Sequence, residues 1–136
     1  MRAVLDPNII ISGLLSPKGS PARVLRAWQE GRFSLIASPA LLDELARALS
    51  YPKLRKRIPP ESATRVVELL ARSGTIVDDP ADPPPRSPDP GDDYLLALAE
   101  RHRAVLVSGD QDLLGLSDRY PVFTAADFLN WLDRTT

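Results

Sequence analysis

The chain has 136 residues, of which 43% are hydrophobic and 26% charged, and its formal net charge at pH 7 is −1. This length and composition are ordinary for one globular domain with a single hydrophobic core. The absence of cysteine excludes disulfide bonds, thiol catalysis and cysteine-ligated zinc. No apolar run approaches the roughly 20 residues of a membrane-spanning helix, and the N-terminus lacks the order of a signal peptide. We therefore expect a cytoplasmic protein with no membrane partner.

Short apolar segments alternate with helical patterns along the chain. Five segments have the apolar character of buried strands, namely 2–6, 33–37, 75–77, 104–108 and 121–123. Helices are predicted at about 9–15, 20–31, 38–50, 60–74, 92–102, 110–116 and from 124 onward. The proline-rich stretch 79–91 is predicted to be an extended connection. This alternation indicates a single domain, 1–136, with an α/β three-layer sandwich fold, in which helices flank a central parallel sheet.

Acidic side chains occur beside apolar segments, where they are least expected. Asp6 ends the first predicted strand and Asp110 follows the fourth, while Glu44 lies on an apolar helix face. Asp92 and Asp93 open the apolar run of a later helix. A carboxylate beside a core is desolvated and tends to become neutral unless a cation or a hydrogen-bond donor holds it. Ligands of parallel α/β folds bind beyond the carboxyl ends of the strands, so this pattern predicts a divalent-metal site at that edge.

Each acid also has an ordinary structural interpretation. Asp92 and Asp93 would be stabilised by the dipole at a helix N-terminus, and Asp110 would cap the short helix that follows it. Asp6 would be a turn residue, and Glu44 would reach solvent at the edge of its apolar stripe. If only these ordinary interpretations held, all four acids would lie at the expected positions of one pocket by chance. The functional interpretation is therefore favoured.

The two halves of the chain differ in charge. Residues 1–72 contain twelve Lys and Arg against six Asp and Glu, whereas residues 73–136 contain five against twelve. A basic part that faces an acidic pocket suits a polyanionic substrate that meets metal ions there. The densest positive run, a candidate RNA-binding segment, consists of Lys53, Arg55, Lys56 and Arg57. The alternative interpretation is a solvated helix end.

Four segments, taken in this order, resemble the PIN domain family. They are Leu5-Asp6-Pro7-Asn8, the helix that carries Glu44, the run from Asp92 to Ala99, and the run from Val107 to Leu114. The resemblance covers nearly the whole chain. It is closest to small bacterial single-domain members assigned as toxins of type II toxin–antitoxin pairs. The resemblance implies a PIN-like fold and an endoribonuclease, dependent on Mg²⁺ or Mn²⁺, that hydrolyses RNA phosphodiester bonds.

The resemblance also implies which acids are catalytic and bind metal. Carried over by position, they are Asp6, Glu44, Asp93 and Asp110. Asp93 is preferred over Asp92 because the acid of the family directly precedes the apolar helical run, which begins here at Tyr94. Asp92 remains a further candidate ligand.

Other positions match the polar residues around these acids. Asp112 is a further candidate ligand, and Asn8 and Ser108 match positions that support the first and last acids. Pro7 departs from the family, which more often has Thr there. Because that side chain is not a ligand, we expect a small structural change.

The residue types suit the implied chemistry. Carboxylate oxygens select Mg²⁺ or Mn²⁺ over softer metals, and Mg²⁺ keeps several bound waters. A bound ion would lower the pKa of a water and offset charge in the transition state. The resemblance further implies an RNA substrate, a homodimer and a small antitoxin that would place an Arg or Lys among the carboxylates.

Two other classes of protein compete with the nuclease. One is a PIN-like protein that binds RNA or a partner without cutting. The other is a phosphoacceptor domain with Asp6 as nucleophile, which requires a second acid two residues on or a late lysine. The chain has Asn8 there, and its last lysine is Lys56. The only histidine, His102, leaves no basis for a histidine-dependent triad or a typical zinc site.

Overall fold

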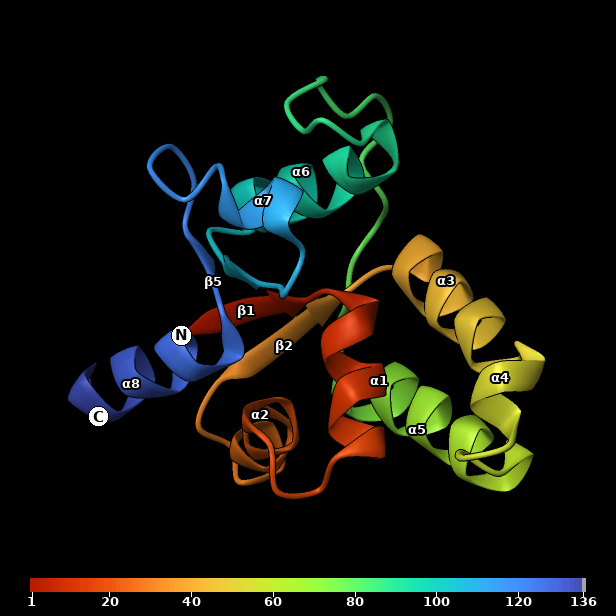
Figure 1. Cartoon of the computed structure of the whole chain (residues 1–136). Coiled ribbons are helices and arrows are strands. Elements are labelled where there is room, and N and C mark those ends of the chain that lie inside the picture. The colour runs from red at the N-terminus through yellow and green to blue at the C-terminus, as the bar shows by residue number, and fades with distance from the viewer. Residues whose placement is uncertain (136) are drawn as a thin grey trace.

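A computed structural model of the chain describes residues 1–135 (Figure 1). In chain order its elements are β1 (Arg2–Leu5), α1 (Pro7–Leu15), α2 (Ser20–Gln29), β2 (Ser34–Ala37), α3 (Pro39–Leu49), α4 (Pro52–Arg55), α5 (Pro60–Ser73), β3 (Thr75–Ile76), the 3-10 helix η1 (Pro90–Asp92), α6 (Asp93–Arg101), β4 (Val105–Val107), α7 (Gln111–Leu114), β5 (Val122–Phe123) and α8 (Ala125–Thr135). In this part of the chain, no helix is both long and apolar enough to cross a membrane.

The strands form one sheet in the order β3-β2-β1-β4-β5, and every neighbouring pair is parallel. β1 is central, because Ala3 pairs with Leu35 of β2 on one side and with Val105 of β4 on the other. Parallel strands require a crossover between them, and here helices supply each crossover. The predicted α/β fold with a central parallel sheet is confirmed.

Helices cover both faces of the sheet. Figure 1 shows α6 on one side and α1, α2 and α8 on the other. The core between these layers is apolar; Leu5 and Leu106 from the strands and Phe128 from α8 are at most 1% exposed. Burying a leucine of this kind stabilises the fold by about 1.5–3 kcal/mol relative to exposure. Phe128 also packs edge-on against Phe33, with ring centroids 5.0 Å apart.

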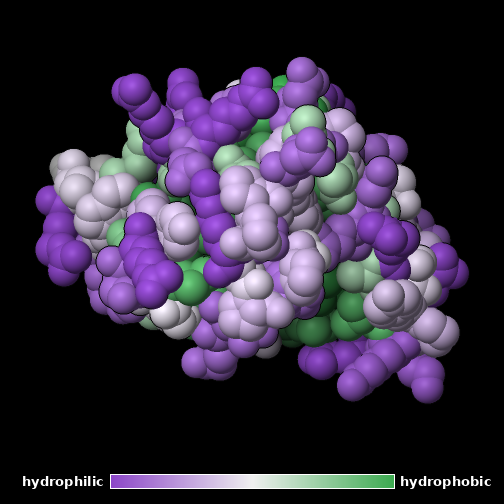
Figure 2. Space-filling view, turned by 90° about the horizontal axis from the view of Figure 1, so that it is seen from above, coloured by the Kyte–Doolittle hydropathy of each residue, from purple (hydrophilic) through white to green (hydrophobic). Residues whose placement is uncertain are grey.

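The surface seen from above is mainly hydrophilic (Figure 2). Hydrophobic residues show there only in smaller, separate areas between the charged side chains. This pattern is typical of a solvated face and differs from a broad apolar docking surface.

Two local features differ from the sequence prediction. The helix α4 lies between the predicted helices 38–50 and 60–74, where none was predicted; Pro52 is its first residue, and the fixed φ of proline is compatible with a first helical turn. The helix predicted from about 92 begins at Asp93, and a 3-10 turn that was not predicted, Pro90–Asp92, directly precedes it.

Candidate active site

The carboxyl ends of β1 and β4 lie side by side, because Leu5 pairs with Val107. The next residue of each strand therefore meets the other, and the Ser108 hydroxyl donates a hydrogen bond of 2.8 Å to Oδ2 of Asp6. The same hydroxyl accepts a hydrogen bond of 3.0 Å from the backbone N–H of Asp110. One fully buried serine thus connects the first and last acids of the predicted site.

Asp6 is a buried carboxylate that also caps α1. Pro7 opens the helix without an N–H, and the backbone N–H of Asn8 donates to Oδ1 of Asp6 at 3.1 Å. Burial raises the pKa of Asp6 above 3.8, the hydrogen bonds from Asn8 and Ser108 lower it, and the charge of Asp110 raises it. The net pKa shift is upward, so local donors do not fully compensate for the desolvated charge. Asn8 acts through its backbone, and its side chain is exposed.

Asp110 caps the short helix α7. Its Oδ1 accepts a hydrogen bond of 2.8 Å from the backbone N–H of Asp112. The negative charge of Asp110 raises the pKa of both Asp6 and Asp92. The structure therefore brings Asp110 close to these acids, whereas Asp112 contributes a backbone N–H and its side chain is exposed.

Asp92 is the third acid at this edge. Its pKa is raised to about 7, first by burial and then by the negative charges of Asp110, Asp89 and Asp6. Its Oδ2 is buried and has no hydrogen-bond partner among the described residues. A buried, unpartnered oxygen among like charges is suited to accept a cation. Asp6, Asp92 and Asp110 are called the acid cluster below.

Asp93 has a different position from the one predicted. Its Oδ1 accepts hydrogen bonds from the backbone N–H groups of Arg86 (3.0 Å) and Ser87 (2.7 Å). Asp93 is 5% exposed, and these hydrogen bonds connect the proline-rich 79–91 segment to the start of α6. These contacts favour Asp92 over Asp93 as the acid that faces Asp6 and Asp110. Successive residues of a helix point about 100° apart, so the two neighbouring carboxylates cannot face the same partners.

Glu44 of α3 faces α6. Its Oε2 accepts a hydrogen bond from the hydroxyl of Tyr94. The pKa of Tyr94 is raised by burial, by this hydrogen bond, and by the negative charges of Glu44, Asp6 and Asp79. Tyr94 is therefore hydrogen-bonded to Glu44 and near enough to Asp6 for its charge to affect the pKa of the hydroxyl.

Neither Tyr94 nor Asp79 was predicted from the sequence as a site residue. Oδ2 of Asp79 accepts a hydrogen bond of 3.0 Å from the backbone N–H of Ala40, and its Oδ1 is buried without a partner in the described part of the chain. Tyr94 belongs to the apolar run that identified α6, and Asp79 is in a loop with several acids. Neither position carries a periodic signal that would mark it.

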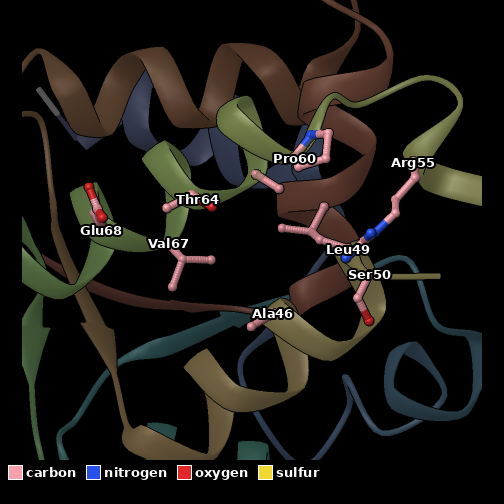
Figure 3. A pocket seen from close by; sticks show the side chains of 9 residues that line it. Ala46, Leu49, Ser50, Arg55, Pro60, Thr64, Val67 and Glu68 are labelled. Carbon is pink, nitrogen blue, oxygen red and sulfur yellow. The ribbon is translucent and has the colours of Figure 1, made fainter. Parts of the chain in front are cut away.

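The basic run is separate from the acid cluster. All four of its side chains are exposed, on α4 and directly after it, and the described residues provide none of them with an ion-pair partner. Arg55 also borders a small cavity between α3 and α5 (Figure 3). Leu49 and Val67 contribute to its apolar lining.

Mg²⁺ or Mn²⁺, which the family resemblance implies, fits the residue types at the acid cluster. Carboxylate oxygens are the ligands of these ions. The site lacks positive charge, because the pKa values of Asp6 and Asp92 are raised and Oδ2 of Asp92 is buried without a hydrogen-bond partner among the described residues. However, the described residues contain no group of three or more acidic or histidine side chains arranged to hold a metal ion. The acids thus fit a divalent cation in charge and chemistry, without forming a closed cage.

Known proteins of similar fold or sequence include two structures and one sequence relative. VapBC2 from Rickettsia felis, solved bound to a DNA fragment from their promoter, has a TM-score of 0.61 and 15% identity over 91% of this chain and 97% of that chain. FitAcB from Neisseria gonorrhoeae has a TM-score of 0.59 and 18% identity, and the match covers 91% and 98% of the two chains. These likenesses establish the shared fold. An uncharacterized protein of Methanocaldococcus jannaschii is 29% identical over 120 residues, which are 87% of this chain and 76% of that protein.

The family assignment rests on a sequence match. The family model described as PIN domain matches residues 2–112, which include all three members of the acid cluster and Glu44. This span is most of the chain, and the likeness of fold agrees with it. The chain belongs to the PIN domain family.

Proposed function

We propose that this protein is a metal-dependent endoribonuclease. The observation that carries the proposal is the acid cluster, in which three separate segments bring carboxylates to one edge of the sheet. The pKa values of Asp6 and Asp92 are raised there, as expected for acids that await a cation. The family membership supports a nuclease, and the donor chemistry supports Mg²⁺ or Mn²⁺.

The residues of the chain have distinct roles in this proposal. Asp6, Asp92 and Asp110 would hold the ion, which when bound lowers the pKa of a water and offsets charge on the phosphate. Ser108 fixes the orientation of Asp6 through its hydroxyl. Tyr94 holds Glu44 beside the cluster, so that Glu44 is available to bind water or a second ion.

The biological role follows from the family resemblance. We infer a toxin of a type II toxin–antitoxin pair, and the likeness of fold to VapBC2 and FitAcB supports this inference. A small antitoxin would then neutralise the acid cluster with an Arg or Lys. A homodimer and a cytoplasmic location are proposed on the same basis.

The second candidate is a PIN domain that binds RNA or a protein without cutting. It is favoured by one observation, namely that no group of acids in residues 1–135 forms a complete metal site. The two candidates differ in a single measurable property, which is metal-dependent turnover.

The deciding experiment is cleavage of labelled single-stranded RNAs by the purified protein with Mg²⁺, Mn²⁺ or EDTA. Asp6→Asn and Asp92→Asn test the cluster, and Asp118→Asn is the matched control because Asp118 is exposed and does not contribute to the pKa shifts of the cluster acids. Metal-dependent cutting that is lost in the two cluster variants alone supports the nuclease. Cutting that survives in them refutes the site. RNA binding without cutting in any metal favours the second candidate.

A further inference from the structure

A cavity lies beside the hydrogen bond between Glu44 and Tyr94, and one face of α3 forms much of its wall. Ala40, Glu44 and Arg47 line it at intervals of three or four residues, which places them in one row along the helix. Tyr51, which also lines the cavity, directly follows the C-cap of α3 and is the N-cap of α4. The cavity has a volume of about 460 Å³, within the range of about 300–1,000 Å³ for ligand pockets.

The cavity is open because three of its lining residues are small. Ala40 and Ala48 on α3 have only a methyl group, and Gly91 of η1 has no side chain. The larger side chains of Arg47 and Tyr51 therefore border an open space. Tyr94 also lines it, so the cavity adjoins the position of Glu44 near the acid cluster.

Arg47 provides positive charge that the fold does not use. Its Nε makes one long hydrogen bond of 3.5 Å to the carbonyl oxygen of Asp43. No ion pair involving Arg47 is found within residues 1–135, although Glu44 lies one turn away on the same helix. An arginine without an acidic partner at a cavity is suited to bind a phosphate with two donors.

Tyr51 provides an aromatic surface that the core does not use. It is 62% exposed, the largest exposed fraction among the large hydrophobic side chains described. Its backbone carbonyl begins α4 by accepting hydrogen bonds from Leu54 and Arg55, so the backbone fixes its place while the ring remains open to solvent. Exposed aromatic rings beside positive charge are the usual stacking platforms for unpaired bases.

From these observations we infer a binding subsite for single-stranded RNA in this cavity, in which Tyr51 stacks on a base and Arg47 binds an adjacent phosphate. The inference rests on the proposed function, because it supplies the path by which RNA reaches the acid cluster. One end of the path is the Glu44–Tyr94 pair, and the other continues into the exposed basic run. Bases must be unpaired to stack on a side chain, so the subsite selects single strands over duplexes.

The test measures binding by the full-length protein in EDTA, so that cleavage does not interfere. The probes are a short fluorescent oligoadenylate and an abasic oligomer of the same length and charge. Tyr51→Ala should weaken oligoadenylate binding roughly 5- to 150-fold, the range for loss of one stacked base, and leave abasic binding unchanged. Tyr51→Phe should retain the affinity, because the ring remains.

Arg47→Gln should weaken binding of both probes and reduce the slope of log K against log salt by about 0.7, the value for one phosphate of a single strand. Arg23→Gln is the matched control, since Arg23 is exposed on α2 and outside the cavity. Circular dichroism and the unfolding midpoint verify that each variant is folded.

The inference and the proposed function can fail separately. If Tyr51→Ala and Arg47→Gln both bind the two probes with unchanged affinity, the inference is overturned, even where the wild type cuts RNA. A protein partner would then be the remaining candidate for the cavity. Equal losses for both probes in Tyr51→Ala also overturn the stacking role. A selective loss of oligoadenylate binding supports the inference, even where the wild type cuts no RNA and the nuclease proposal fails.

Discussion

The hydroxyl of Ser108 donates to the carboxylate of Asp6 across 102 positions of sequence. The contact follows from the parallel register of β1 and β4, which aligns the residues that follow Leu5 and Val107. Both side chains are buried. Asp6 is thus oriented by a residue at the end of β4, the strand that leads to Asp110. Folding of the sheet and order of the site therefore depend on each other.

Ser108→Ala should destabilise the protein and weaken the site together. It removes a donor to a buried carboxylate and an acceptor for the Asp110 N–H, which costs about 1–3 kcal/mol. Urea unfolding in EDTA measures the loss. The control is Ser117→Ala, at an exposed position, where the change should stay within about 0.5 kcal/mol. Equal unfolding midpoints for the two variants would show that the Ser108 hydroxyl has no structural role.

Neighbouring aspartates should have opposite phenotypes. Asp92→Asn removes a proposed metal ligand, so it should abolish cleavage. Because it also removes one charge from a repulsive cluster, the metal-free protein should be as stable as the wild type or more stable. Asp93→Ala leaves two backbone N–H groups, those of Arg86 and Ser87, without their acceptor and should cost about 1–3 kcal/mol. Cleavage assays and urea unfolding on both variants measure the two effects. If Asp93→Ala left stability intact and abolished metal binding, the original preference for Asp93 would be restored.

The sheet was predictable because its strands are short, apolar and separated by clear helical patterns. Buried strands of a parallel sheet are apolar on both faces, and this property survives in a single sequence. The helix α4 was not predictable in the same way. It has four residues and no buried side chain, so no hydrophobic periodicity marks it.

The candidate site was predictable only to the level of the strand ends. Asp6 and Asp110 follow from the rule that ligands bind beyond the carboxyl ends of parallel strands. The choice between Asp92 and Asp93 depends on the backbone N–H groups of Arg86 and Ser87 that bond to Asp93, and the sequence does not reveal these contacts. The bond from Tyr94 to Glu44 joins residues 50 positions apart, and only the folded structure brings them together.

The stability of the metal-free protein should fall as pH rises from about 4 to about 7 through the ionisation of Asp92. Its pKa is 3.8 in the reference state and about 7 in the fold, so the folded state binds the proton more tightly. Stability from this group is therefore fully present below the unfolded pKa and lost as pH rises through the folded pKa. The raised pKa of Asp6 acts in the same direction.

The measurement for this pH prediction compares thermal unfolding in EDTA at about pH 5 and about pH 8 for the wild type and Asp92→Asn. Because other groups titrate as well, the informative quantity is the difference between the two proteins. Asp92→Asn should gain stability relative to the wild type at the higher pH. A difference that does not change with pH would mean that Asp92 ionises normally in the fold.

Tyr94→Phe should impair cleavage without unfolding the protein. The ring and its packing remain, but Glu44 loses the hydroxyl that orients it. Loss of a hydrogen bond that orients a site carboxylate typically costs roughly 10- to 100-fold in activity or metal affinity. Tyr120→Phe is the matched control, because it also removes one hydroxyl while keeping the ring that packs under Arg86. A double variant with Glu44→Gln should be no worse than Glu44→Gln alone, since the carboxylate that Tyr94 orients is then already absent. Additive losses in this cycle would show that Tyr94 acts independently of Glu44.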